Sequence, residues 1–225
     1  MEDHSKGCGL HEHHTGSLMD ELMCHFPYAI FSVAVGILVL SLVEFFGIMR
    51  GDAATASRGT HMLFHSFHFV HLAFAASGAL ITFSRYSTNM MRGFVVAMCS
   101  AIVFCTLSDI LLPYVAGRLL GVSMRLHICW GSELRNVIPF LSIGLINGLV
   151  ISKNGSSKKV YSLITHIGHI FCSSLAALFY MVSEGFTNWY PFMGPLFVLL
   201  IMAVVIPCTL ADIIIPVVIA RSEKA

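Results

Sequence analysis

Six apolar runs, each long enough to cross a membrane as a helix, leave this chain few ways to fold. A helix needs about 20 mostly apolar residues to cross roughly 30 Å of hydrocarbon. Charged residues make up 11% of the sequence, whereas a soluble domain carries about a quarter. The runs cover residues 26–48, 60–84, 93–117, 136–152, 160–183 and 192–220. The sequence therefore predicts an all-α integral membrane protein with six transmembrane helices.

Basic residues in the loops predict the orientation of these helices, because Lys and Arg are enriched on the cytoplasmic side. One side of the predicted topology carries Lys6, Arg85, Arg92, Lys153, Lys158, Lys159, Arg221 and Lys224, and the other carries Arg50, Arg58, Arg118, Arg125 and Arg135. We therefore expect both termini in the cytoplasm. Residues 1–25 lack the basic start and cleavage site of a secretory signal, so the first helix is expected to be a retained anchor. The net charge of +1 argues against a nucleic-acid partner.

The two halves of the chain repeat one another weakly, and the matched positions are mostly polar. The pairs are His65 with His166, His68 with His169, Asp109 with Asp212, and Pro113 with Pro216. Each half has three spans, and this odd number makes the second half enter the membrane from the opposite face. The sequence thus predicts two three-helix inverted-topology repeats, 26–120 and 121–225, after a His-rich N-terminal tail, 1–25. Transporters often have this plan, with the site at the repeat interface. A purely structural duplication is the alternative.

Histidines recur along one face of the second span and again in the fifth. At 100° per residue, one helix face collects His61, His65, His68 and His71, and the equivalent face of the fifth span collects His166, His169 and Cys172. Imidazole and thiol side chains share the ability to bind zinc, copper, nickel or iron. Ionisable groups inside a membrane are costly and usually functional. We interpret these residues as metal ligands; for any single histidine, a bond to backbone or lipid headgroups is the alternative.

One carboxylate lies within the third span of each half. Asp109 precedes Pro113 by four residues, and Asp212 precedes Pro216 by the same spacing. Because proline has no N–H, the carbonyl four residues earlier loses its helical partner. Helix arithmetic places His68 and Asp109 at a similar depth, roughly 12 Å below one face. We predict both aspartates as inner metal ligands, and a merely structural kink is the alternative. Additional candidates on the same helix faces are Cys105, Thr106, Cys208 and Thr209.

The N-terminal tail is the third place where metal-binding residue types gather. Its candidate ligands include His11, His13 and His14, with His4 and Cys8 before them. Short His-rich tracts bind transition metals. Such a tail could collect ions for the membrane body; a solvated leader without a role in binding is the alternative.

Together these patterns favour a small transporter or channel for a divalent transition metal, with zinc, copper, nickel and iron all open. A haem b subunit of a redox complex is a second hypothesis, with His25, His61, His65, His127 and His166 as candidate axial ligands. A metal enzyme or a structural membrane subunit is a third. No phosphate loop or HExxH motif is present, so an enzyme is not favoured. The expected partners are the lipid bilayer and the metal ion, while a homo-oligomer or a membrane-complex partner stays open.

Overall fold

The computed structural model describes residues 18–50, 53–153 and 158–222, except the side chains of 18–22, 24, 50, 53–56 and 158–163. Every regular element within these ranges is helical. In chain order they are α1 (Leu18–Arg50), α2 (Ala53–Tyr86), α3 (Met90–Thr106), η1 (Leu107–Leu111), α4 (Leu112–Leu119), α5 (Cys129–Ser132), α6 (Leu134–Lys153), α7 (Lys158–Ser183), η3 (Tyr190–Phe192), α8 (Met193–Thr209), η4 (Leu210–Ile214) and α9 (Ile215–Arg221).

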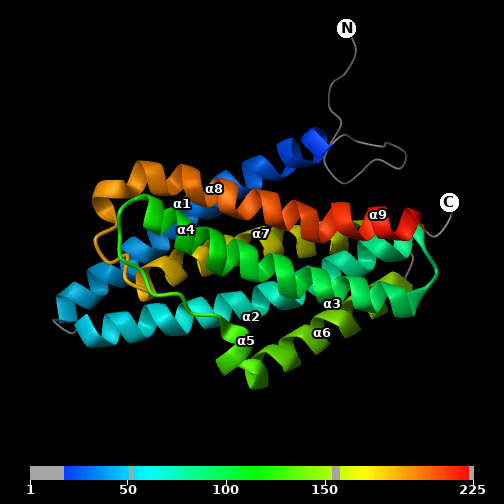
Figure 1. Cartoon of the computed structure of the whole chain (residues 1–225), viewed down its shortest axis with the longest axis horizontal. Helices are drawn as coiled ribbons and strands as arrows, with labels where there is room; N and C mark the ends of the chain where they lie inside the picture. The colour runs from blue at the N-terminus through cyan, green and yellow to red at the C-terminus, as the bar shows by residue number, and fades with distance from the viewer. Residues whose placement is uncertain (1–17, 51–52, 154–157, 223–225) are drawn as a thin grey trace, which may run out of the picture.

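Six stretches of the described chain are helical, long and apolar enough to cross a membrane. They are His25–Met49, Ser57–Tyr86, Met90–Leu119, Leu134–Lys153, Ile164–Ser183 and Tyr190–Arg221. The third joins α3, η1 and α4, and the sixth joins η3, α8, η4 and α9. Figure 1 shows them gathered into one bundle, with α1 inclined to the others. The prediction of an all-helical chain with six spans is confirmed, although α1 begins at Leu18, inside the predicted tail.

Helices α2 and α7 form the centre of the bundle. They are the most buried of the spans, and α2 packs against α7, α6 and α3. Close approach of α6 to α2 depends on two glycines, since a Cβ at Gly144 would collide with the backbone of Ala73 and one at Gly148 would lie 3.0 Å from the carbonyl oxygen of Ser77. Small residues spaced in this way let membrane helices approach closely. Between these glycines, Asn147 Nδ2 donates a hydrogen bond to Ser77 Oγ (3.0 Å), a polar contact between α6 and α2.

The outward faces of the bundle are apolar. Large exposed side chains include Phe31 on α1, Val103 on α3, Ile143 on α6 and Val198 on α8. Water would penalise so much exposed apolar surface, whereas lipid would not. The surface therefore agrees with the composition in indicating a protein that lies within a bilayer.

A single π turn interrupts the third span and another interrupts the sixth. In η1, the N–H of Leu112 bonds to the carbonyl of Leu107, five residues earlier, and η4 repeats this pattern. Each π turn contains one of the two aspartates, Asp109 or Asp212, and is followed directly by a leucine or isoleucine and then a proline. The proline pattern predicted a local break; the structure shows that the helix widens by one residue and continues. Such π turns occur frequently at functional sites.

Candidate metal centre

Asp109 lies at the centre of a hydrogen-bond network from three spans. Its Oδ2 accepts from Nδ1 of His68 (2.8 Å) and Nδ1 of His71 (2.7 Å), both on α2. Its Oδ1 accepts from the hydroxyls of Ser108 (2.7 Å) and Ser173 (2.8 Å), the latter on α7. A carboxylate offers about four lone-pair positions, so this network uses the acceptor capacity of Asp109. The side chain holds both imidazole rings through Nδ1 and leaves their Nε2 atoms for other contacts.

Asp212 has a related position in the second half of the chain. Its Oδ1 lies 2.8 Å from Nδ1 of His169, and its Oδ2 lies 3.4 Å from Nδ1 of His166. The carboxylate packs against Gly78 of α2, where an added Cβ would lie 2.8 Å from Oδ1 of Asp212. The lack of a side chain at Gly78 therefore makes room for this carboxylate. Each half thus contributes one buried aspartate that contacts two histidines of a neighbouring span.

The two histidine–aspartate groups meet at a buried cluster between α2, α3, α7 and α8. Ligand atoms of His71, His169 and Cys208 all lie within 4.8 Å of one another. Nε2 of His71 is 3.6 Å from Sγ of Cys105 and 3.9 Å from Sγ of Cys208. The rings of His71 and His169 are 4.4 Å apart at their centroids. We call the three residues that meet, His71, His169 and Cys208, the central cluster; Cys105 adjoins it through His71.

The spacing of the central cluster suits a tetrahedral transition-metal ion. Zn–N bonds of about 2.0–2.1 Å and Zn–S bonds of about 2.3 Å place a nitrogen and a sulfur on one ion roughly 3.5 Å apart. The two separations from His71 Nε2 to sulfur are 3.6 and 3.9 Å. Nε2 of His169 is buried without a hydrogen-bond partner, a costly state that a bound ion would relieve. The donor atoms and their distances therefore fit a metal such as zinc.

Each imidazole of the central cluster has a carboxylate next to its Nδ1 atom. His71 is held through Nδ1 by Asp109, and His169 contacts Asp212 through Nδ1. Metal-binding histidines usually donate their second ring N–H to a carboxylate or carbonyl, which fixes the tautomer and the ring orientation. His71 has this hydrogen bond to Asp109, whereas Nδ1 of His169 and Oδ1 of Asp212 lie 2.8 Å apart without hydrogen-bond geometry.

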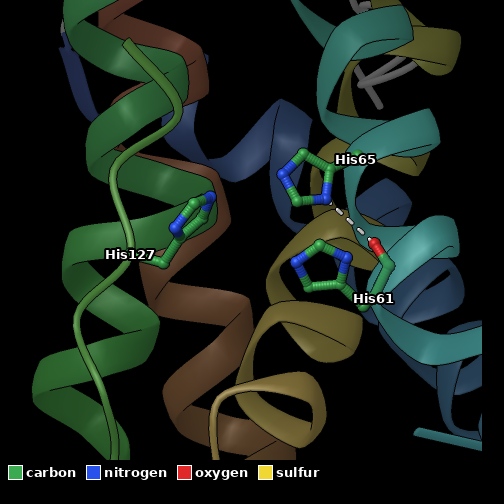
Figure 2. Close-up of side chains that lie close together, drawn as sticks. All are labelled: His61, His65 and His127. Carbon is green, nitrogen blue, oxygen red and sulfur yellow. Dashed lines mark hydrogen bonds between the residues drawn. The ribbon is translucent and has the colours of Figure 1, made fainter. Parts of the chain in front are cut away.

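Two further groups of histidines flank the central cluster. His61, His65 and His127 bring their ligand atoms within 4.8 Å of one another (Figure 2), and we call them the outer cluster. This cluster lies where the first part of α2 meets the connection between α4 and α5. Near the start of α1, the ring of His25 contacts that of His166, with centroids 4.0 Å apart. Histidines therefore occur at intervals along much of the length of the bundle.

The remaining candidates from the sequence lie outside both clusters. The hydroxyls of Thr106 and Thr209 donate to the carbonyls of Ile102 and Val205, each four residues earlier and at 2.7 Å. Cys172 is buried, but it is not among the ligand groups that the described residues form. The tail candidates His11, His13 and His14 lie outside the described residues.

Sequence reasoning missed the serines that complete the Asp109 network. Ser108 directly precedes Asp109, and Ser173 follows His169 by four residues on the same face of α7. That spacing was the available signal for Ser173, because a polar residue one turn from a candidate ligand can reach the same site. Ser173 Oγ also lies 3.2 Å from Ser108 Oγ, so the two hydroxyls share one environment.

Two further cysteines lie outside the central cluster, and the exposed one provides a control. Cys99 on α3 is exposed. Cys129 lies in α5, outside the six spans, and is buried. Burial, reinforced by nearby carboxylates, raises the pKa of the Cys129 thiol to about 12.

The candidate haem ligands fall into two groups, His25 with His166, and His127 with His61 and His65. The His25 and His166 rings are 4.0 Å apart with their planes at 82°, and those of His61 and His65 are 4.4 Å apart. Two axial ligands would have to lie on opposite faces of the porphyrin. The His25 and His166 rings touch and leave no room for a porphyrin plane between them, while the ring of His127 lies 5.4 Å from that of His65 and 6.1 Å from that of His61.

Comparisons with known proteins assign no family to the chain. No protein-family model matches it, and the searches of curated proteins and of solved structures found no match. The chemistry of the two clusters therefore indicates the function.

Proposed function

We propose that the protein binds a divalent transition-metal ion in the central cluster and carries it across the membrane. The observation that carries this proposal is the convergence of His71, His169 and Cys208, from three spans, to within 4.8 Å in a buried interior. Imidazole nitrogen and thiolate sulfur are poor ligands for Ca²⁺ and Mg²⁺ but good ligands for zinc, copper, nickel and iron. Because one of the three ligand atoms is sulfur, zinc and copper are favoured within this group.

The two aspartates are assigned to support the ligands, although the sequence favoured direct ligation. The acceptor positions of Asp109 are taken by two imidazoles and two hydroxyls. Asp212 likewise contacts the Nδ1 atoms of His166 and His169. Two carboxylates buried in a medium of low dielectric need positive charge nearby. A divalent ion in the central cluster supplies that charge, so the aspartates both orient the imidazoles and favour a cation over a neutral ligand.

Histidines on either side of the central cluster support transport rather than storage. His68 lies on the same face of α2 as His71, on the side towards the outer cluster. Its Nε2 is buried without a hydrogen-bond partner. On the other side, His166 contacts both Asp212 and His25. An ion can pass between neighbouring sites when each binds it, and none binds it too tightly to leave. A single structural site would need no such series.

We further propose that the halves 26–120 and 121–225 are related by inverted topology. Support comes from the matching π turns at Asp109 and Asp212, and from the matching central positions of α2 and α7. In inverted-repeat transporters the substrate site lies at the repeat interface. The central cluster fits that expectation, because His71 comes from the first half and His169 and Cys208 come from the second.

Zinc uptake into proteoliposomes tests the proposal. The full-length protein is reconstituted with a zinc-sensitive dye inside the vesicles, and initial rates are compared for the wild type, Cys208→Ser and His169→Gln. Cys99→Ser is the matched control, because it removes an exposed thiol of the same helix bundle. We expect both cluster variants to lose most uptake and the control to keep it. Wild-type rates in both cluster variants would refute the proposed site, and stoichiometric zinc binding without uptake by the wild type would refute transport.

A further inference from the structure

The outer cluster is assembled from two segments that are distant in sequence. His61 and His65 project from adjacent turns of α2, and His127 faces them from the connection between α4 and α5 (Figure 2). The ring centroids of His65 and His127 are 5.4 Å apart, and those of His61 and His127 are 6.1 Å apart. On α2, ten residues separate His61 from His71 of the central cluster, which corresponds to about 15 Å along the helix. The two clusters are therefore separate places.

The ring of His65 is fixed in the tautomer that a metal requires. Its Nδ1 lies 3.0 Å from the carbonyl oxygen of His61, so Nδ1–H donates and Nε2 keeps its lone pair. Nε2 of His65 and Nε2 of His127 are both buried without a hydrogen-bond partner. Leaving buried nitrogen atoms unpaired is unfavourable. Two such atoms near a third, exposed imidazole form a site that a cation would complete.

The segment that carries His127 is held in place by the end of α7. The N–H of Arg125 donates to the carbonyl of Glu184 at 3.0 Å. The N–H of His127 donates to the hydroxyl of Tyr180 at 3.2 Å, and that hydroxyl donates to the carbonyl of Arg125 at 3.4 Å. Tyr180 is buried and packs its ring against Phe64 of α2. His127 is thus positioned on a tethered segment, and Tyr180 is its positioning residue.

From this geometry we infer a second metal site, in which His61, His65 and His127 bind a divalent ion that prefers nitrogen, such as Zn²⁺. Three protein ligands leave a fourth position of a tetrahedral ion open, and the exposure of His61 lets water or a carrier reach it. The absence of sulfur among these three ligands distinguishes the site from the central cluster. This inference rests on the proposed function for the class of ion, while the site itself can be tested without any transport.

Cobalt titration of the full-length protein in detergent separates the two sites. Co²⁺ bound to nitrogen ligands in a four-coordinate site gives visible d–d absorption, and a thiolate ligand adds a strong near-ultraviolet charge-transfer band. Spectra and stoichiometry are compared for the wild type, His127→Gln, His61→Gln and Tyr180→Phe. Leu126→Gln is the matched control, because it changes the exposed neighbour of His127 in the same segment.

We expect His127→Gln and His61→Gln each to bind one Co²⁺ fewer than the wild type, with the thiolate band retained. Tyr180→Phe should keep the stoichiometry but weaken the nitrogen-only site by about 10-fold, the lower end for loss of an outer-shell partner. Leu126→Gln should match the wild type. Unchanged stoichiometry and affinity in both histidine variants would overturn the outer site. The zinc uptake of Cys208→Ser tests only the central cluster. The cobalt titration and the uptake assay therefore show separately whether the outer site or the proposed transport fails.

Discussion

Replacing Asp109 by asparagine tests whether the buried carboxylates orient the imidazoles or bind the ion themselves. Asparagine keeps the shape, and its carbonyl oxygen can accept from His68 and His71 as Oδ2 does. Its amide then faces Ser108 and Ser173, whose hydroxyls can rotate to accept. The packing should therefore survive, and the change removes the negative charge behind His71.

The expected loss is moderate because the carboxylate acts through the ring. Outer-shell partners of metal-binding histidines are typically worth about 10–100-fold in metal affinity. This range corresponds to about 1.4–2.8 kcal/mol of binding free energy. We expect Asp109→Asn to weaken zinc binding at the central cluster by this factor, and Asp212→Asn to do the same from the other side.

Zinc affinity is measured by competition with a chelator of known affinity, and circular dichroism checks that the helices are intact. Glu44→Gln is the matched control, since it neutralises another carboxylate of the bundle, one that accepts a hydrogen bond from Trp189 Nε1 at 2.7 Å. It should leave zinc affinity unchanged. Equal affinity of wild type and Asp109→Asn would refute the orienting role. Complete loss of the site in a folded Asp109→Asn protein would instead identify the carboxylate as a direct ligand.

Three further predictions concern Gly78, Asn147 and the N-terminal tail. Gly78→Ala should lower both the thermal midpoint and the zinc affinity, because the new Cβ meets the Asp212 carboxylate. Gly59→Ala on the same helix is the control and should change neither quantity, because its new Cβ has no atom within 4 Å. Equal melting curves and zinc affinities for the two variants would contradict this prediction. Asn147→Ala should destabilise the protein by about 0.6 kcal/mol in a micellar unfolding titration, since it loses its bond to α2; an unchanged midpoint would mean that the bond contributes nothing. Deleting residues 2–14 should slow zinc uptake at low metal concentration only, and loss of uptake at all concentrations would show that the tail does more than collect ions.

Hydropathy was sufficient to predict the six spans, because the length of a membrane helix is set by the bilayer and not by its neighbours. Helix arithmetic also placed His68 and Asp109 at one depth, and the structure brings them to 2.8 Å. Both arguments work because the rise and the angle per residue of a helix are nearly constant. Each of these predictions needs the geometry of only one helix, or of two antiparallel helices joined by a short turn.

Helix arithmetic could not predict features that depend on how the helices rotate against one another. The periodicity of the fifth span favoured Cys172 as the third ligand, yet Cys208 of α8 lies beside His71 and His169. Both cysteines are buried, and the packing of α7 against α8 decides which of them lies beside the histidines. The proline rule likewise predicts a missing hydrogen bond, but it does not say whether a helix unwinds or widens into the π turn seen at Asp109.

X-ray absorption spectroscopy of the protein loaded with one equivalent of zinc tests the central claim most directly. The account predicts a mixed first shell, with nitrogen at about 2.0–2.1 Å and sulfur at about 2.3 Å. It also predicts that Cys208→Ser reduces the sulfur contribution, while Cys99→Ser leaves it unchanged. A shell of oxygen and nitrogen without sulfur in the wild type, or a sulfur signal that Cys208→Ser does not alter, would contradict a metal site between the two halves of the bundle.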